Sequence, residues 1–241
     1  MANRVEKVGA EAVAAKGWLK ANKWLILRRV SQLSILGLFI ISPFLVEVLD
    51  ELWIAKGTLS SSVILGVIPL TDPYVLIQGM VSGDVMPEVA GLVGALIVIA
   101  FYLVVGGRVY CSWVCPINMI ADAAAWMRRK LGLKEKSHIS RSTRYWMLGL
   151  TLILPLAVGG IVWELINPVS LVYRGILFGM GTAWTVLVGI FLFDLLISND
   201  GWCGRICPVG AFYSLLTVKS PLRVVASKRE DCDDCMDCYL V

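Results

Sequence analysis

Four long apolar stretches constrain the fold of this 241-residue chain more than any other feature of its sequence. A helix needs about 20 apolar residues to cross the hydrocarbon core of a bilayer, which is roughly 30 Å thick. We therefore expect an all-α integral membrane protein with four transmembrane helices. The expected spans are Val30–Leu49, Val89–Val105, Tyr145–Leu165 and Gly179–Ile197.

The composition supports a membrane protein and excludes several kinds of haem and metal site. Hydrophobic residues make up 58% of the chain and charged residues 17%, against roughly 45–50% and about 25% in soluble domains. The chain has a single histidine, His138, and no CxxCH motif. A haem held by two histidines, a covalently attached haem and a three-histidine zinc site are therefore excluded. The net charge of +4 gives no reason to expect nucleic acid as a partner.

The basic residues are distributed unevenly about the expected spans. Of the 22 Lys and Arg residues, all but Lys56 and Arg174 precede the first span, separate the second from the third, or follow the fourth. The positive-inside rule then places both termini and the central loop in the cytoplasm. Residues 1–27 carry many of these charges among apolar residues and are expected to form a basic amphipathic helix on the membrane surface.

Three sequence landmarks occur twice in the same order. Leu36–Pro43 and Leu148–Pro155 share the pattern LGLxxIxP, and Asp72-Pro73 is matched by Asn167-Pro168. The third landmark is a Cys-x3-Cys-Pro motif, which follows the second span and again the fourth. We interpret the chain as two parallel two-helix repeats, 28–116 and 145–208, with a cytoplasmic linker at 117–144 and a cytoplasmic segment at 209–241.

The paired motifs carry Cys111, Cys115, Cys203 and Cys207. A pseudo-twofold relation between the repeats would bring the two motifs together, and four thiolates are the standard ligand set of an iron–sulfur cluster. Proline favours the first position of a helix, so each motif also predicts a helix N-terminus, which favours negative charge. Two other interpretations stay open. In the first, each motif is only a turn that starts a helix, and its cysteines bind nothing. In the second, the two motifs exchange electrons as dithiols without a metal.

A third motif, Cys232-x2-Cys235-x2-Cys238, matches the first three cysteines of the bacterial ferredoxin pattern. The fourth cysteine of that pattern does not follow in the sequence. The motif therefore predicts a second cluster that takes a ligand from elsewhere, or else an acidic tail without a cluster.

Together these features resemble the NapH family, the membrane component of the quinol dehydrogenase that serves periplasmic nitrate reductase. The resemblance rests on Arg28-Arg29-x-Ser-Gln32, the two Cys-x3-Cys-Pro motifs, the ferredoxin-type run and the stretch Trp163–Ser170. It implies a multi-pass protein of the bacterial inner membrane that binds 4Fe–4S clusters and is active only within a complex. The implied partners are a NapG-type periplasmic iron–sulfur protein and cytochrome subunits of nitrate reduction.

A quinol substrate needs an apolar pocket and groups that accept two protons. Glu47 and Glu164 lie at the outer ends of the first and third spans and are the expected proton acceptors, although interface anchoring explains them equally well. Four neighbouring residues are expected to bind the quinol: Asp72, Gln78, Asn167 and Arg174. The apolar outer loop at 52–88 is expected to form interfacial or re-entrant helices. Asp194, at the end of the fourth span, is either a proton relay or the partner of an arginine.

Two functions of other classes stay open. The chain is alternatively a thiol-redox or metal-centre assembly factor, or a membrane anchor for an extrinsic redox protein. The presence of a cluster and its reduction by quinol would distinguish these from an electron-transfer subunit.

Overall fold

The computed structural model describes residues 17–49, 55–64, 66–83, 88–133, 139–179, 181, 183–198 and 201–217. Cys232, Cys235 and Cys238 lie outside these residues, as does most of the expected surface helix at 1–27. The backbone of Glu47 lies in a helix that the structure describes, but the structure does not describe the side chain of this residue. The described part is mostly helical.

The longest helix, α4 (Lys23–Leu49), begins before the expected span and contains Pro43. It follows a single turn, α3 (Trp18–Ala21). Among the described helices, only α4 includes a segment, Lys23–Pro43, that is long and apolar enough to cross a membrane. The remaining three expected spans appear as shorter apolar helices, so the structure supports one span by length and leaves the other three as predictions.

These shorter helices are α6 (Val89–Val105), α8 (Thr143–Val158) and α11 (Ala183–Leu196). The second expected span matches α6 at both ends. The third was expected to continue to Leu165, but α8 ends at Val158 because Gly159 adopts a left-handed conformation with φ of 67°. A separate short helix, α9 (Val162–Ile166), follows the break.

The expectation of an all-helical chain is wrong for the outer loop, which begins as a three-stranded antiparallel sheet in the order β1-β2-β3. The strands are β1 (Ala55–Gly57), β2 (Ser61–Ile64) and β3 (Ile68–Thr71). The β-branched residues of β2 and β3, which are Val63, Ile64, Ile68 and Thr71, favour this extended pairing. The sheet packs against α6 at Gly94, where a Cβ would lie 2.9 Å from the Pro69 carbonyl oxygen. The loop then turns helical in α5 (Pro73–Ser82).

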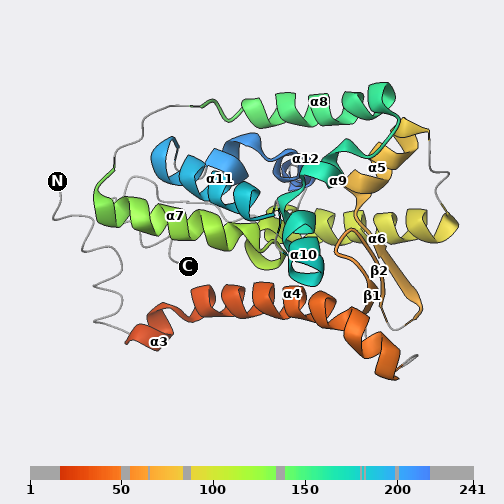
Figure 1. The fold of residues 1–241 in the computed structure, drawn as a ribbon, viewed down its shortest axis with the longest axis horizontal. Helices are drawn as coiled ribbons and strands as arrows, with labels where there is room; N and C mark the ends of the chain where they lie inside the picture. Colours follow the sequence, from red (N-terminus) through yellow and green to blue (C-terminus); the bar gives the residue numbers. More distant parts are fainter. Residues whose placement is uncertain are drawn as a thin grey trace.

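The cysteine motifs lie near the middle of the long axis of the molecule. A π-helical turn, η1 (Tyr110–Val114), joins α6 to α7 (Ile117–Leu131), and Figure 1 shows α6 and α7 nearly in line. Helix α11 packs beside α7, and η2 (Trp202–Ile206) leads from it to α12 (Pro208–Thr217), which packs against α8 and α6. Helix α10 (Pro168–Phe178) fills the space between α11 and α4 (Figure 1). The expected linker at 117–144 therefore contains a 15-residue helix.

Candidate metal centre

The two Cys-x3-Cys-Pro motifs adopt the same local structure. Each begins in a π-helical turn and ends with its second cysteine at the C-cap, and a proline and a new helix follow directly. The Cys115 amide donates to the Tyr110 carbonyl at 3.1 Å, and the Cys207 amide donates to the Trp202 carbonyl at 2.8 Å. Proline lacks the amide hydrogen that a first helical turn leaves unpaired, so Pro208 suits the first position of α12, whereas Pro116 is the N-cap of α7.

The four cysteines of these motifs, Cys111, Cys115, Cys203 and Cys207, line a single cavity. All four are reduced and partly buried. The convergence expected from the repeat is therefore present in the fold, although the motifs come from opposite halves of the chain. Within the described residues, no three His, Cys, Asp or Glu side chains are grouped as ligands of a single metal ion.

Four helices begin at this cavity. Their first residues or caps belong to its lining: Asp72 before α5, Ile117 at the start of α7, Asn167 before α10, and Val209 in the first turn of α12. A helix N-terminus carries a partial positive charge from its unpaired amide groups. Convergence of four such ends favours an occupant with net negative charge.

The amide groups of these first turns also contact sulfur. The Cys115 thiol accepts hydrogen bonds from the backbone of Ile117 and Asn118, and the Cys207 thiol accepts from Val209 and Gly210. Burial outweighs these bonds and raises the pKa of Cys115, like that of Cys111, to about 12. Burial also raises the pKa of Cys203 and Cys207. The thiols are therefore neutral unless a positively charged centre binds them.

These observations test the fit of an iron–sulfur cluster. A cluster supplies positively charged iron to deprotonate the thiols, and the complete four-thiolate assembly is an anion that suits helix N-termini. Trp163 also lines the cavity, and its buried Nε1 has no hydrogen-bond partner among the described residues. The residues present therefore fit a cluster bound by all four cysteines.

Helix α4 holds the first motif from outside. Gln32 is fully buried and donates to the Ser112 carbonyl at 3.0 Å, while the Ser31 hydroxyl donates to the Trp113 carbonyl at 3.0 Å. Arg29 donates to the Gln32 side-chain oxygen at 2.8 Å and pairs with Asp122 of α7. The Arg-Arg-x-Ser-Gln sequence thus positions a cysteine turn, a role that the spacing alone did not indicate.

A buried carboxylate holds the second motif. Asp194 accepts the Trp202 amide hydrogen at 2.8 Å, and Arg128 donates to the Asp194 backbone carbonyl at 3.1 Å. The arginine contact is made by the backbone carbonyl of Asp194, so it does not decide between the two interpretations that the sequence left open for the carboxylate. The position of this carboxylate at the start of η2 makes it a support for the cysteine turn.

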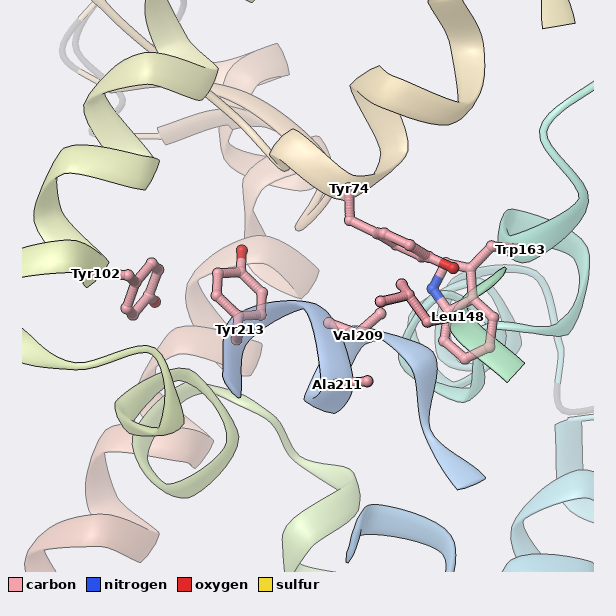
Figure 2. Close-up of a cluster of buried hydrophobic side chains, with 7 residues drawn as sticks. All are labelled: Tyr74, Tyr102, Leu148, Trp163, Val209, Ala211 and Tyr213. Atoms are coloured by element: carbon pink, nitrogen blue, oxygen red, sulfur yellow. The ribbon is translucent and has the colours of Figure 1, made fainter. Parts of the chain in front are cut away.

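A buried hydrophobic cluster rich in aromatic rings (Figure 2) shares Trp163 and Val209 with the cavity lining. The rings of Tyr110 and Tyr213 stack with centroids 4.7 Å apart, and Tyr102 meets Tyr213 edge to face at 4.9 Å. The Tyr213 hydroxyl donates to Asp72 at 3.4 Å, and the Tyr74 amide donates to the same carboxylate at 3.0 Å. These two hydrogen bonds lower the pKa of Asp72, but burial raises it by more, so that the pKa is about 6. No spacing of residues along the chain indicated this cluster.

The residues expected to bind quinol are divided among different surroundings. Asp72 and Asn167 line the cysteine cavity, although they were expected at the opposite end of the spans. The reason is that α5 and α10 begin in the interior, where each residue caps its helix by accepting an amide hydrogen. Gln78 is fully buried and donates to the Thr151 carbonyl at 2.9 Å while accepting from the Trp163 amide.

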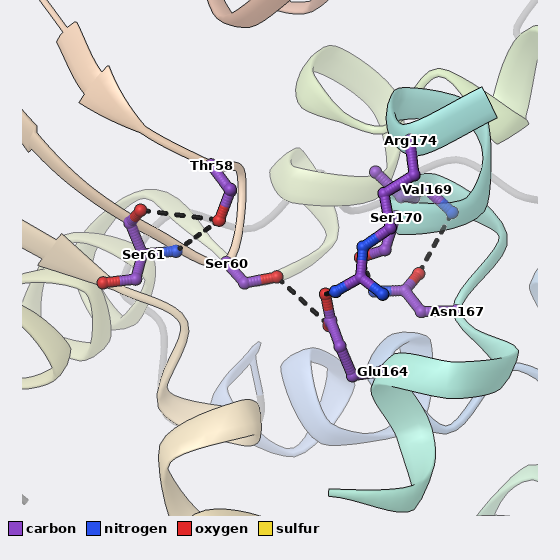
Figure 3. A network of polar contacts seen from close by, with 8 residues as sticks. All are labelled: Thr58, Ser60, Ser61, Glu164, Asn167, Val169, Ser170 and Arg174. Atoms are coloured by element: carbon purple, nitrogen blue, oxygen red, sulfur yellow. Dashed lines mark hydrogen bonds and ion pairs between the residues drawn. The ribbon is translucent and has the colours of Figure 1, made fainter. Parts of the chain in front are cut away.

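Glu164 and Arg174 form a separate polar network (Figure 3). Arg174 donates to Glu164 at 3.3 Å, and the Ser60 hydroxyl donates to the other oxygen of the same carboxylate, also at 3.3 Å. Neither Glu164 nor Arg174 lines the cysteine cavity. The predicted set therefore does not form one site, and Ser60 is a member of the network that the sequence did not reveal.

Two segments of the chain match the family described as "4Fe-4S binding domain". The matched residues are 88–134, which contain α6, η1 and α7, and 180–224, which contain α11, η2 and α12. Each match therefore holds one Cys-x3-Cys-Pro motif.

Curated relatives match over nearly the whole chain. The methylamine utilization ferredoxin-type protein MauN of Methylorubrum extorquens is 47% identical over 96% of this chain and 79% of its own length. The ferredoxin-type proteins NapH of Haemophilus influenzae and Escherichia coli are 45% and 42% identical, over 100% of this chain and 82% of their own lengths. The chain belongs to the NapH and MauN family of ferredoxin-type proteins.

The resemblance to NapH drawn from the sequence is thereby confirmed, and MauN proteins join NapH as relatives of similar identity. No solved structure matches the chain. The four cysteines that line the cavity all fall within the matched 4Fe–4S segments, whereas Cys232, Cys235 and Cys238 lie beyond them. The family supports iron–sulfur binding and, in coarse terms, an electron-transfer role.

Proposed function

We propose that this chain is a multi-pass subunit of the bacterial inner membrane, with both termini cytoplasmic. In this proposal it takes electrons from membrane quinol and passes them through an iron–sulfur cluster to a NapG-type periplasmic iron–sulfur protein. The single observation that carries the proposal is the cavity lined by four cysteines from two matched 4Fe–4S segments. The third cysteine motif, at 232–238, is proposed to bind a further cluster with a ligand from elsewhere.

The cluster would supply one-electron redox chemistry, and the chain supplies its environment. Cys111, Cys115, Cys203 and Cys207 would hold the iron. The first turns of α7 and α12 donate amide hydrogens to the second cysteine of each motif, which stabilises the sulfur when it is anionic. Ile117 and Val209 are buried apolar parts of the cavity wall and exclude water from it.

The test replaces one proposed ligand and leaves its motif otherwise intact. In anaerobically purified Cys207→Ser protein, we expect a loss of about four irons per chain and of one EPR signal after dithionite reduction. Ser112→Ala is the matched control, because Ser112 lies inside a motif but bonds only to carbonyls of its own turn through its hydroxyl. Unchanged iron content in Cys207→Ser would contradict the proposal.

A methylamine-linked role is the second candidate, supported by the 47% identity to a MauN protein. The two candidates differ in the partner that accepts the electrons. Co-purification from nitrate-grown and from methylamine-grown cells of the source bacterium would separate them. A NapG-type iron–sulfur protein bound to the chain supports the nitrate role, and its absence together with a methylamine-induced partner supports the other.

The alternative of a thiol-redox factor has less physical support. Thiol exchange requires an accessible thiolate, whereas burial raises the pKa of Cys111 and Cys115 to about 12. A membrane anchor without redox chemistry does not explain why four helix N-termini meet at four cysteines.

A further inference from the structure

Two arginines from different elements lie beside the first cysteine motif. Arg108 is exposed and stands between α6 and η1, three residues before Cys111. Its guanidinium is close enough to the Cys111 thiol and to the Tyr145 hydroxyl to interact with both electrostatically. Arg144, in the first turn of α8, is half-buried. We call Arg108, Arg144 and Tyr145 the arginine patch.

The guanidinium of Arg144 is held in place by its neighbour. It stacks over the Tyr145 ring, 4.8 Å from the ring centroid, and donates to the Tyr145 hydroxyl at 2.8 Å. Its buried Nε has no hydrogen-bond partner among the described residues. A planar guanidinium that is already positioned pairs well with a carboxylate, because both of its forked donors face the same way. The patch therefore favours a ligand that carries several carboxylates.

The C-terminal segment of the chain has this chemistry. Five of its eight residues from 230 to 237 are acidic, and they surround the cysteines of the third motif. The acidic residues are Glu230, Asp231, Asp233, Asp234 and Asp237. We call residues 230–237 the acidic segment.

Helix α12 leads from the arginine patch towards the acidic segment in the sequence. The Ser214 hydroxyl lies 3.3 Å from the Tyr145 hydroxyl, and α12 ends three residues later at Thr217. Glu230 follows 13 residues after Thr217. A chain of that length extends over about 40 Å at most and about 20 Å on average when flexible. The acidic segment can therefore reach the patch without any change in the described fold.

We propose that the acidic segment docks on the arginine patch through pairs between arginine and carboxylate groups. This docking goes beyond the proposed function, because attraction between these charges needs no cluster in either motif. Its consequence concerns electron flow. Because Arg108 lies beside Cys111, docking brings the third cysteine motif next to the cysteine cavity, so that in the proposed function the two clusters exchange electrons without another carrier.

Anionic lipid headgroups share the charge of the acidic segment, but the segment fits the patch better. A phosphatidylglycerol headgroup carries one negative charge, whereas the segment carries up to five. The short connection to α12 also keeps the segment at a millimolar effective concentration near the patch. The positive-inside rule places the patch and the segment on the same side of the membrane. We therefore assign the patch to the segment and treat lipid as an outcome of the test.

Carbodiimide cross-linking tests the docking. This reagent joins carboxylates to lysine amines at zero length and leaves arginine unmodified, so Arg108→Lys and Arg144→Lys make the patch reactive while they retain its charge. The full chain in phosphatidylcholine nanodiscs is treated and its peptides are mapped by mass spectrometry. We expect a product within one chain between residues 230–237 and each substituted position, and its loss in about 1 M salt, where the Debye length is about 3 Å.

Arg129→Lys is the matched control, because Arg129 is an exposed arginine of α7 outside the patch. We expect about tenfold less product at position 129 than at positions 108 and 144, since only the docked geometry gives a high effective concentration. Equal product at all three positions, or none at 108 and 144, would overturn the docking. The use of two patch variants guards against a loss of folding in either one.

Nanodiscs of phosphatidylglycerol separate the segment from lipid. We expect the product at positions 108 and 144 to stay within about twofold of its amount in phosphatidylcholine. Its disappearance there would assign the patch to lipid headgroups and overturn the docking. Iron per chain, measured in the same samples, separates the proposals. A chain that holds no iron but gives the product contradicts only the proposed function, and a chain that holds iron without the product contradicts only the docking.

Discussion

Gly107 lies where the chain leaves α6 and α12 crosses it. A Cβ at this position would lie 1.9 Å from the Tyr213 carbonyl oxygen and 2.7 Å from its carbonyl carbon. The obstacle is backbone, so no side-chain rotation can relieve it. The missing side chain thereby allows the turn before Cys111 and the helix after Cys207 to approach each other.

We expect Gly107→Ala to destabilise the protein by about 3 kcal/mol or more, because overpacking against rigid backbone forces the elements apart. The measurement is thermal unfolding in detergent, with iron content as a second readout. Gly149→Ala is the matched control, since a Cβ at Gly149 meets nothing within 4 Å and alanine favours a helix interior by about 0.5–1 kcal/mol. Equal stability of the two variants would contradict this account.

The individual site residues were predictable to different degrees. The repetition of the Cys-x3-Cys-Pro motif was enough to predict that four cysteines lie together, because a pseudo-twofold axis between two repeats brings equivalent segments face to face. These cysteines are Cys111, Cys115, Cys203 and Cys207. The placement of Asp72 was not predictable, because nothing in the sequence indicates that α5 begins in the interior. Ser60 carries no motif and gains its role only from the fold of the sheet.

At the scale of elements, α4 positions the first cysteine turn through side chains on one of its faces. Gln32 pairs with a carbonyl of η1, and an η2 amide pairs with Asp194 of α11. The two turns therefore share a conformation but depend on different supports. The lengths of the apolar stretches indicated α6 at both ends and the other three apolar helices with shifted ends, whereas they could not reveal the sheet at 55–71, whose strands are three or four residues long.

We expect Gln32→Leu to loosen η1 without unfolding the molecule. Leucine retains the approximate volume but leaves the half-buried Ser112 carbonyl without its donor, which costs about 1 kcal/mol or more. Hydrogen exchange of residues 110–116 should become faster, and iron bound per chain should fall. Ser34→Ala, on an exposed position of the same helix, should change neither quantity. Unaltered exchange in Gln32→Leu would mean that α4 does not hold the turn.

For the whole molecule, the distribution of Lys and Arg residues predicts the orientation of the chain in the membrane, and this orientation remains a prediction. The described helices include one segment, Lys23–Pro43, that can span a bilayer by length and composition. The other apolar helices have 10–17 residues and expose large hydrophobic side chains, as at Trp146, Phe178 and Trp184. Such surfaces suit contact with lipid or with partner subunits.

Reporter fusions test this topology. Green fluorescent protein fused after Leu133 should fluoresce, because the loop after α7 is expected in the cytoplasm, whereas fusion after Gly83 should remain dark. Alkaline phosphatase fused at the same positions should show the opposite pattern. Fluorescence at both positions would contradict the expected orientation.

The division of the cysteine cavity between two halves of the chain has a consequence for biogenesis. Cys111 and Cys115 emerge from the ribosome long before Cys203 and Cys207, so the four cysteines that are proposed to hold the cluster are complete only when the second half has been made. In the proposed function, insertion of the cluster therefore follows translation of both halves. Once inserted, the proposed cluster cross-links the two halves, and a chain made without iron lacks this link.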